Sequence, residues 1–290
     1  MKIFIAGVHG QVGQALQCQA SSLGWQVKAV DRDELDITDA DAVLATIRSY
    51  APEAVINAAA YTAVDQAEAE PDMAFAINRD GPSYIANACE EAGIPLVHYS
   101  TDYVFDGTKA NAYGEDDPVA PLGVYGASKL AGEQAVRAGC PQHLILRTSW
   151  VFSAAGHNFV KTMLRLGKER QQLRVVADQF GKPTAAAELA RLTCEILPKA
   201  KDRWGIYHVA QPSVTSWHGF AEAIFFEANR QGFDLKVTDV QAITTAEYPI
   251  PARRPVNSEL NCERLEAAFG VSIRPWRESL AEVIGELKHV

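Results

Sequence analysis

A tyrosine and a lysine four residues apart, Tyr125 and Lys129, are side chains whose types and spacing could do acid–base chemistry. On a helix, residues at this spacing lie on one face, one turn apart. A lysine ammonium beside a phenol favours the phenolate, so we expect Lys129 to lower the pKa of Tyr125 from its usual value of about 10. The tyrosine could then exchange a proton with a substrate alcohol or ketone. The alternative is that Tyr125 and Lys129 lie on a solvated helix surface and have no catalytic role. The surrounding sequence must decide between these two interpretations.

Polar side chains stand upstream of this pair, at the end of a predicted strand over residues 95–99. Ser100, Thr101 and Asp102 follow that strand directly. A hydroxyl at the carboxyl end of a strand can hydrogen-bond a substrate oxygen, whereas turn formation is the alternative for the first two residues. Tyr103 and Phe105, just beyond, are expected to pack in the core.

A glycine-rich turn near the N-terminus predicts a dinucleotide site. Gly7, Gly10 and Gly13 follow a short apolar run and open a helical pattern. Such glycines let the backbone turn tightly and approach a pyrophosphate, which the free amides at the helix start then face. Asp31 ends a second strand, 18 residues beyond Gly13, close to the spacing of a carboxylate that binds the adenosine ribose. An ordinary turn is the alternative.

The residues after the second strand leave the choice of cofactor open. A carboxylate such as Asp31 prefers the free ribose hydroxyls of NAD, whereas Arg32 beside it could accept the 2′-phosphate of NADP. Asp36 and Ile37 could line an adenine pocket. Asp39 is better explained as a helix cap.

Strands and helices alternate through the first half of the chain. Strands are expected at 2–6, 26–30, 54–60, 95–99 and 143–148, and helices from about residue 11 to 23, 40–50, 71–92 and 121–137, with a loop at 107–121. This alternation predicts an α/β fold with a Rossmann-type, doubly wound parallel sheet. Ligands of such sheets bind beyond the carboxyl ends of the strands, where the candidate residues fall.

The second half has a different character. Helices are expected at 158–170, 184–197, 216–230, 262–269 and 277–287, with short strands near 174–177 and 205–210. We therefore expect an NAD(P)-binding domain over 1–150 and a smaller C-terminal α/β substrate-binding domain over 151–290. No linker separates the two, so we expect them to be interleaved.

The composition narrows the classes of function. A formal net charge of −9 argues against a non-specific nucleic-acid binder. No apolar run is long enough for a membrane span, and the N-terminus reads as a strand and not as a signal peptide. The five cysteines are scattered, which indicates neither a disulfide framework nor a zinc site. Reduced thiols in a cytoplasmic protein are expected.

Several stretches together carry a resemblance that spans the chain. They are GVHGQVG at 7–13, NAAAYTAVDQAE at 57–68, HYSTDYVFDG at 98–107, VYGASKLAGE at 124–133, LRTSWVF at 146–152, HNFVKTML at 157–164, DQFGKPT at 178–184 and RPVNSELN at 254–261. The chain thereby resembles the extended short-chain dehydrogenase/reductase family and, within it, the dTDP-4-dehydrorhamnose reductases.

The resemblance implies roles for matching positions. Tyr125, Lys129 and Thr101 would be catalytic, and Thr101, Asp102, Trp150 and Arg254 would meet the sugar nucleotide. The cofactor NADPH or NADH would be bound by Gly7, Gly10, Gln11, Val12, Gly13, Asp31, Arg32, Asp36, Ile37, Ala60, Tyr61, Thr62, Tyr99, Tyr125 and Lys129. Core packing is the alternative for Trp150.

The implied activity is reduction of dTDP-4-dehydro-L-rhamnose to dTDP-L-rhamnose, a step of carbohydrate biosynthesis. Two alternatives stay open. A nucleotide-sugar epimerase or dehydratase would use the same residues without net consumption of cofactor. A non-catalytic dinucleotide-binding regulatory subunit could dispense with Tyr125 and Lys129, so their presence together with Thr101 argues against it.

One position departs from the family pattern. Some members carry an acidic residue just after the third glycine, which helps to bind Mg²⁺ at a homodimer interface. Gln14 and Ala15 stand there in this chain, which puts metal-dependent dimerisation in doubt, although an acid such as Glu188 could serve instead.

Overall fold

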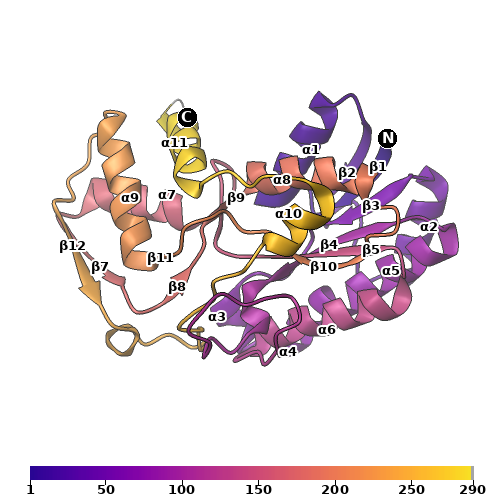
Figure 1. Ribbon diagram of the computed structural model, residues 1–290, viewed down its shortest axis with the longest axis horizontal. Coiled ribbons are helices and arrows are strands. Elements are labelled where there is room, and N and C mark those ends of the chain that lie inside the picture. The colour runs from indigo at the N-terminus through magenta and orange to yellow at the C-terminus, as the bar shows by residue number, and fades with distance from the viewer. Residues whose placement is uncertain (289–290) are drawn as a thin grey trace.

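A six-stranded parallel sheet forms the largest part of the computed structural model, which describes residues 1–288 (Figure 1). Its strands, in spatial order, are β10 (Gly205–His208), β5 (His143–Thr148), β4 (Leu96–Thr101), β3 (Ala54–Asn57), β1 (Lys2–Ala6) and β2 (Gln26–Val30). The central strands β3, β4 and β5 are buried along their whole length. Continuous apolar strands of this kind form because helices cover both faces of a parallel sheet.

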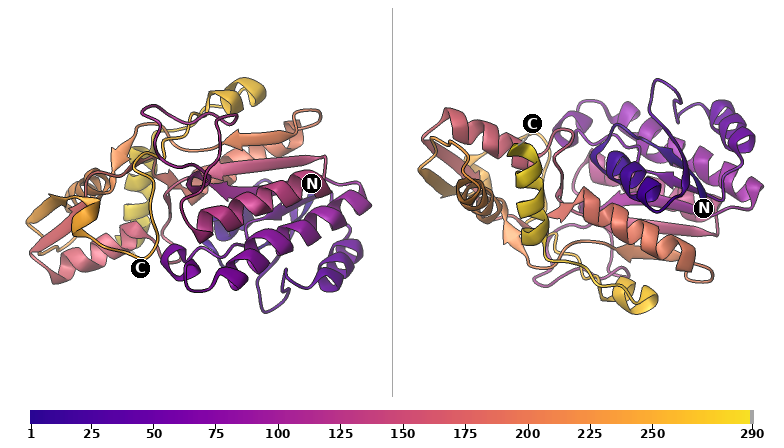
Figure 2. Two further views of the ribbon diagram at one scale, coloured as in Figure 1. Left: turned by 90° about the horizontal axis from the view of Figure 1, so that it is seen from below. Right: turned by 90° about the horizontal axis from the view of Figure 1, so that it is seen from above.

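Side chains of β1 alternate between two hydrophobic cores. Ile3 and Ile5 face a core shared with α1 (Gln11–Ser22) and α8 (Ala186–Ile196), whereas Phe4 faces the opposite core. The second core is shared with α2 (Ala40–Tyr50), α5 (Gly81–Ala92) and α6 (Val124–Gly139). The helices therefore cover both faces, as Figure 2 shows, and the predicted doubly wound α/β fold is confirmed.

The strand order reverses between β1 and β3. From β1 the chain moves outward to β2, and from β3 it moves through β4 and β5 in the other direction. A crevice opens at such a reversal, beyond the carboxyl ends of the strands. The predicted glycine turn follows β1 at this point, and Thr101 ends β4.

The helix expected over 71–92 is interrupted. It consists of α4 (Pro71–Phe75), a π-helical turn (Ala76–Asp80) and α5, which ends at Gly93 with a left-handed φ of 67°. A π-turn widens the hydrogen-bond spacing locally and often marks a functional site. Here it brings the Asn78 side chain, which is fully buried, between two elements of the candidate site.

A smaller α/β unit stands beside the sheet (Figures 1 and 2). Its core is formed by α7 (Phe159–Glu169), α9 (Trp217–Arg230) and α11 (Trp276–Lys288), with β7 (Gln172–Val176) paired to β12 (Asp239–Ile243). Shorter strands lie in two further pairs: β6 (Val151–Phe152) pairs with β9 (Thr184–Ala185), and β8 (Phe180–Gly181) pairs with β11 (Thr215–Ser216). Two short helices, α3 (Val64–Ala67) and α10 (Glu263–Phe269), contact elements of the large unit.

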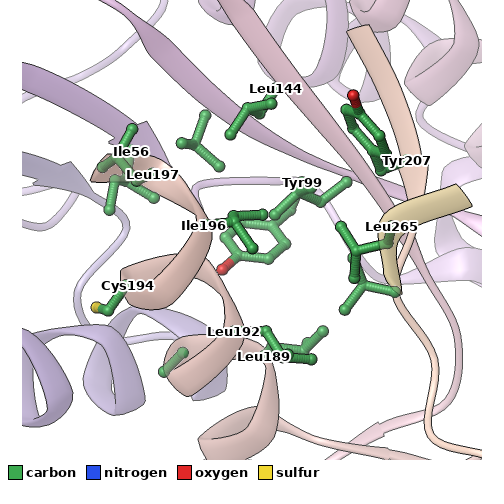
Figure 3. Packing of buried hydrophobic residues seen from close by; sticks show 14 of the residues in the cluster. Ile56, Tyr99, Leu144, Leu189, Leu192, Cys194, Ile196, Leu197, Tyr207 and Leu265 are labelled. Carbon is green, nitrogen blue, oxygen red and sulfur yellow. The ribbon is translucent and has the colours of Figure 1, made fainter. Parts of the chain in front are cut away.

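The chain returns to the large sheet after residue 150. The strand near 205–210, expected in the smaller part, is β10, which pairs in parallel with β5 through Ile206 opposite Ile145. Helix α8 likewise covers the large sheet, and its Leu189, Leu192 and Ile196 belong to the same core as Tyr99 (Figure 3). The proposed division at residue 150 stays a prediction, since sheet-building elements lie on both sides of it.

Within residues 1–288, no helix combines the length and apolar character that crossing a bilayer requires.

Candidate active site

A cavity of about 590 Å³ lies at the carboxyl ends of the central strands. It is lined by the predicted catalytic and substrate residues Thr101, Asp102, Tyr125, Lys129, Trp150 and Arg254. A second cavity of about 710 Å³ is lined by Asp31, Arg32, Asp36 and Ile37. The two share His9, Gly10, Ala58, Ala60 and Thr62. They form one trough, with the predicted adenosine residues at one end and the predicted catalytic residues at the other.

Two elements, α6 and β4, position the catalytic residues. Tyr125 and Lys129 lie one turn apart near the start of α6, and Thr101 is the last residue of β4. Lys129 is almost fully buried and its Nζ donates a hydrogen bond to the Tyr99 carbonyl at 2.6 Å. The Thr101 hydroxyl lies close enough to the Tyr125 phenol to interact with it.

The expected effect of Lys129 on Tyr125 is wrong for this structure. Burial raises the pKa of Tyr125 to about 12, while the nearby Thr101 hydroxyl opposes the rise and the Asp102 charge adds to it. The reason is geometric, since the Lys129 ammonium is directed at a backbone carbonyl. Tyr125 therefore keeps its proton at neutral pH, which suits a proton donor.

Burial also perturbs the other ionisable groups of the cavity. It lowers the pKa of Lys129 to about 8, although the Glu133 charge acts in the opposite direction. It raises the pKa of Asp102 to about 6, against hydrogen bonds that include the one donated by Thr101. A cluster of perturbed groups in a concave site is typical of an active centre.

A buried ion pair fixes α6 to the strands beneath it. Arg147 on β5 donates two hydrogen bonds to Glu133 on α6, at 2.8 and 2.7 Å, and Ser100 on β4 donates a third at 2.5 Å. Both charged side chains are at most 3% exposed. Glu133 lies one turn beyond Lys129, so this network holds the Tyr125–Lys129 face against the end of β4.

The glycine turn has the form that a pyrophosphate requires. Gly7 has φ of +89°, and a Cβ atom there would lie 2.5 Å from the Ala59 nitrogen. A Cβ atom on Gly13 would lie 2.1 Å from the Gly7 carbonyl oxygen, so Gly13 serves helix–strand packing and lies outside both cavities. Helix α1 begins at Gln11 with no acidic residue in its first turn, so its free amides face the trough. These residues fit a dinucleotide.

The residues predicted to bind the adenosine differ in the hydrogen bonds and ion pairs that they form within the protein. Asp31 accepts hydrogen bonds from the backbone of Asp33 and Glu34 and pairs with His9 at 2.9 Å. Asp36 accepts two hydrogen bonds from Thr38, which lower its pKa. Arg32, by contrast, is exposed and forms no hydrogen bond or ion pair in the described part of the chain.

The remaining predicted cofactor residues border the trough in different ways. Gln11 accepts hydrogen bonds from Ser153 and Asn158 and so ties the start of α1 to the segment after β6. Val12, Ala60, Tyr61 and Thr62 line the trough walls. The Tyr99 ring lies in the core (Figure 3) and bonds Thr193, so it is the Tyr99 carbonyl that meets Lys129.

Sequence reasoning missed several residues of the site. Trp217 on α9 stacks on Trp150 with ring centres 3.6 Å apart, and both rings line the cavity. Asn78 bonds the backbone of Tyr61 and the Ser128 hydroxyl, and so connects the loop after β3 with α6. The one sequence signal for Asn78 is the pair Gly81-Pro82, three residues further on, which indicates an irregularity in the helix.

The core assignment made for two aromatic residues holds for one of them. Phe105 is fully buried and stacks on Tyr113 at 4.3 Å, as expected. Tyr103, which was expected in the core, lines the cavity instead, with its ring edge-on to Tyr125 at 5.7 Å. It faces the cavity because the strand alternation ends at Thr101, where the 3₁₀ turn Asp102–Val104 begins.

Mg²⁺ at this site would need a cluster of metal-ligating side chains such as His, Cys, Asp and Glu. Residues 1–288 contain no group of three or more such side chains placed to hold an ion. Glu188, the acid that could have served, is buried and forms ion pairs with Arg191 at 2.8 Å and Arg274 at 3.1 Å. Two arginines thus occupy the carboxylate that a cation would need.

Comparison with known proteins places this geometry in a family. Residues 1–289 match the family model described as the RmlD substrate binding domain. A dTDP-4-dehydrorhamnose reductase of Salmonella typhimurium (strain LT2) is 42% identical, over 99% of this chain and 98% of that protein.

Solved structures agree with the sequence matches. A dTDP-4-dehydrorhamnose reductase of Clostridium acetobutylicum ATCC 824 superposes with a TM-score of 0.94 at 40% identity, covering 99% of this chain and 100% of the other. The enzyme of Bacillus anthracis str. Ames, solved in complex with NADP, gives 0.93 at 38% identity, covering 98% and 99%. The chain belongs to the dTDP-4-dehydrorhamnose reductase family.

Proposed function

We propose that this protein reduces dTDP-4-dehydro-L-rhamnose to dTDP-L-rhamnose at the expense of NADPH or NADH. The observation that carries the proposal is the meeting of Thr101, Tyr125 and Lys129 at one end of a trough whose other end begins at the glycine turn. A proton donor and a dinucleotide cradle in one cavity are the parts that carbonyl reduction requires.

The cofactor would be held by the glycine turn, the first turn of α1 and the residues after β2. The unengaged Arg32 guanidinium supports NADPH, because it is free to meet a 2′-phosphate while Asp31 is already paired. The relative from Bacillus anthracis was solved with NADP. When bound, the reduced nicotinamide supplies the hydride that reduces the sugar ketone.

The chain's own residues supply the proton and the polarisation. Tyr125, protonated because burial raises its pKa to about 12, donates its proton to the sugar oxygen on which negative charge develops. Thr101 donates a hydrogen bond to the same oxygen and stabilises that charge. Lys129, fixed by the Tyr99 carbonyl, places a positive charge beside the reacting groups.

The sugar nucleotide would fill the rest of the cavity. The stacked Trp150 and Trp217 rings offer an apolar wall for a deoxysugar. Arg254 supplies a cation for the diphosphate. We also propose that the enzyme acts in the cytoplasm as a homodimer. Light scattering on the purified protein would test the oligomeric state.

The decisive experiment follows NADPH absorbance with purified protein and dTDP-4-dehydro-L-rhamnose. Stoichiometric oxidation with formation of dTDP-L-rhamnose is expected. An epimerase or dehydratase would convert a nucleotide sugar without net oxidation of NADPH, and a regulatory subunit would bind the dinucleotide without turnover. Either result would overturn the reductase proposal.

A further inference from the structure

A proline-rich segment over residues 249–255, here called the strap, borders the substrate cavity and carries Arg254. Pro249, Pro251 and Pro255 have no backbone N–H, so the strap can make few backbone hydrogen bonds of its own. No helix or strand includes any of its residues. What holds the strap in place must therefore come from a neighbouring element.

One carboxylate provides that anchor. Asp65 on α3 accepts a hydrogen bond from the Ala252 backbone at 3.2 Å with one oxygen and from Arg254 Nη2 at 2.9 Å with the other. Across residues 1–288, the strap backbone makes no hydrogen bond other than the one to Asp65. Arg254 reaches one further group, the Tyr103 hydroxyl. Asp65 thus fixes both the path of the strap and the direction of the Arg254 guanidinium.

The donor groups of Arg254 are not all used by these contacts. Its Nε is buried and has no hydrogen-bond partner, although the side chain lines the substrate cavity. A buried donor of a charged group is costly to leave unsatisfied, and native structures seldom do so without a ligand or water to complete it. An anion in the cavity beside Arg254 would complete it.

We propose that Asp65 is the positioning residue that orders the strap and presents Arg254 to the substrate diphosphate. This inference rests on the proposed function, because it takes the diphosphate of a nucleotide sugar as the anion. Asp65 itself acts only through Arg254 and touches no reacting atom.

The charge on Asp65 opposes this role, since a carboxylate repels a diphosphate. Its side chain is 39% exposed, however, so solvent screens the repulsion, whereas that of Arg254 is 23% exposed. Without Asp65, the strap would lose its backbone anchor, and binding would have to order it anew. For binding of the diphosphate, losing the order of the strap therefore costs more than removing the Asp65 charge gains.

The test compares Asp65→Ala and Asp65→Asn with the wild type and with Asp72→Asn, an exposed acid on the neighbouring α4. Calorimetry with dTDP gives Kd without catalysis, and steady-state kinetics give KM and kcat. For Asp65→Ala we expect Kd and KM to rise about 10-fold while kcat stays within about twofold. Asp65→Asn, which keeps an acceptor for Ala252, should fall between, and Asp72→Asn should match the wild type.

A double-mutant cycle separates positioning from a general structural role. Arg254→Ala should raise the dTDP Kd by a similar factor, and adding Asp65→Ala to it should weaken binding no further. Affinity for NADPH should be unchanged in every variant, which also reports correct folding.

An unchanged or tighter dTDP Kd in Asp65→Ala, or additive effects in the double variant, would overturn the inference. Reduced NADPH affinity in both Asp65 variants would also count against it, because the damage would then be general. Wild-type protein that neither binds dTDP nor oxidises NADPH with the sugar nucleotide would refute the proposed function instead.

Discussion

At Tyr125, burial and hydrogen bonding act on the phenol in opposite directions. Removal from water raises its pKa to about 12, and the Thr101 hydroxyl pulls it down. A phenol that holds its proton can donate it to a developing alkoxide at neutral pH. A protonated Tyr125 therefore suits the proposed direction of catalysis, which is reduction of the ketone.

We expect Tyr125→Phe to lower kcat by about 10³-fold, because the general acid is lost while the ring is retained. NADPH affinity, measured by fluorescence titration, should stay within about twofold of the wild-type value, since the glycine turn is untouched. Activity equal to that of the wild type would remove Tyr125 from the proton-transfer role.

Lys129 should give the pH profile its alkaline limb. Its pKa is lowered to about 8, so the ammonium is present below that pH and is lost as the pH rises through it. We expect kcat/KM, which reports the free enzyme, to fall above about pH 8 as the positive charge beside the reacting groups disappears. A profile that stays flat to pH 10 would show that the charge on Lys129 does not limit the reaction.

At the scale of elements, the catalytic helix depends on the Glu133–Arg147 pair. Glu133→Gln would leave the Arg147 charge buried without its partner, so we expect a loss of about 3–5 kcal/mol in the free energy of unfolding. Urea denaturation measures this loss. Replacing both residues together, as Glu133→Leu with Arg147→Met, should restore much of the stability, because no unpaired charge is left. Equal stability of the single variant would mean that the pair does not fix α6.

Local features of the elements were predictable from sequence, and their distant partners were not. The glycine turn, the Asp39 cap of α2 and the Tyr125–Lys129 helix are all set by nearby residues. The first two stand where expected, whereas the helix expected from residue 121 begins at Val124. The bond between Asp65 and Arg254 joins residues 189 apart, which no local pattern reports. The error on the Tyr125 pKa has the same origin, because burial is a property of the folded chain.

For the whole molecule, the placement of β10 and α8 decides how the chain can be divided. A fragment ending at residue 150 would lack both, so Leu144, Leu146 and Tyr99 would lose the cover that they have in the intact core. We expect this fragment to aggregate or to lack cooperative thermal unfolding by circular dichroism, in contrast to the full chain. A fragment that melts cooperatively and binds NADPH would show that the predicted first domain is autonomous.

The position of β10 in the chain also has a consequence for synthesis on the ribosome. Strand β5 ends at Thr148, whereas its edge partner β10 begins at Gly205. At roughly 5–20 residues per second, several seconds pass before the partner is made. During that interval β5 presents an unpaired, apolar edge, the kind of surface that recruits other strands. The nascent chain is therefore most exposed to misassembly, and most dependent on chaperones, while residues 149–204 are being translated.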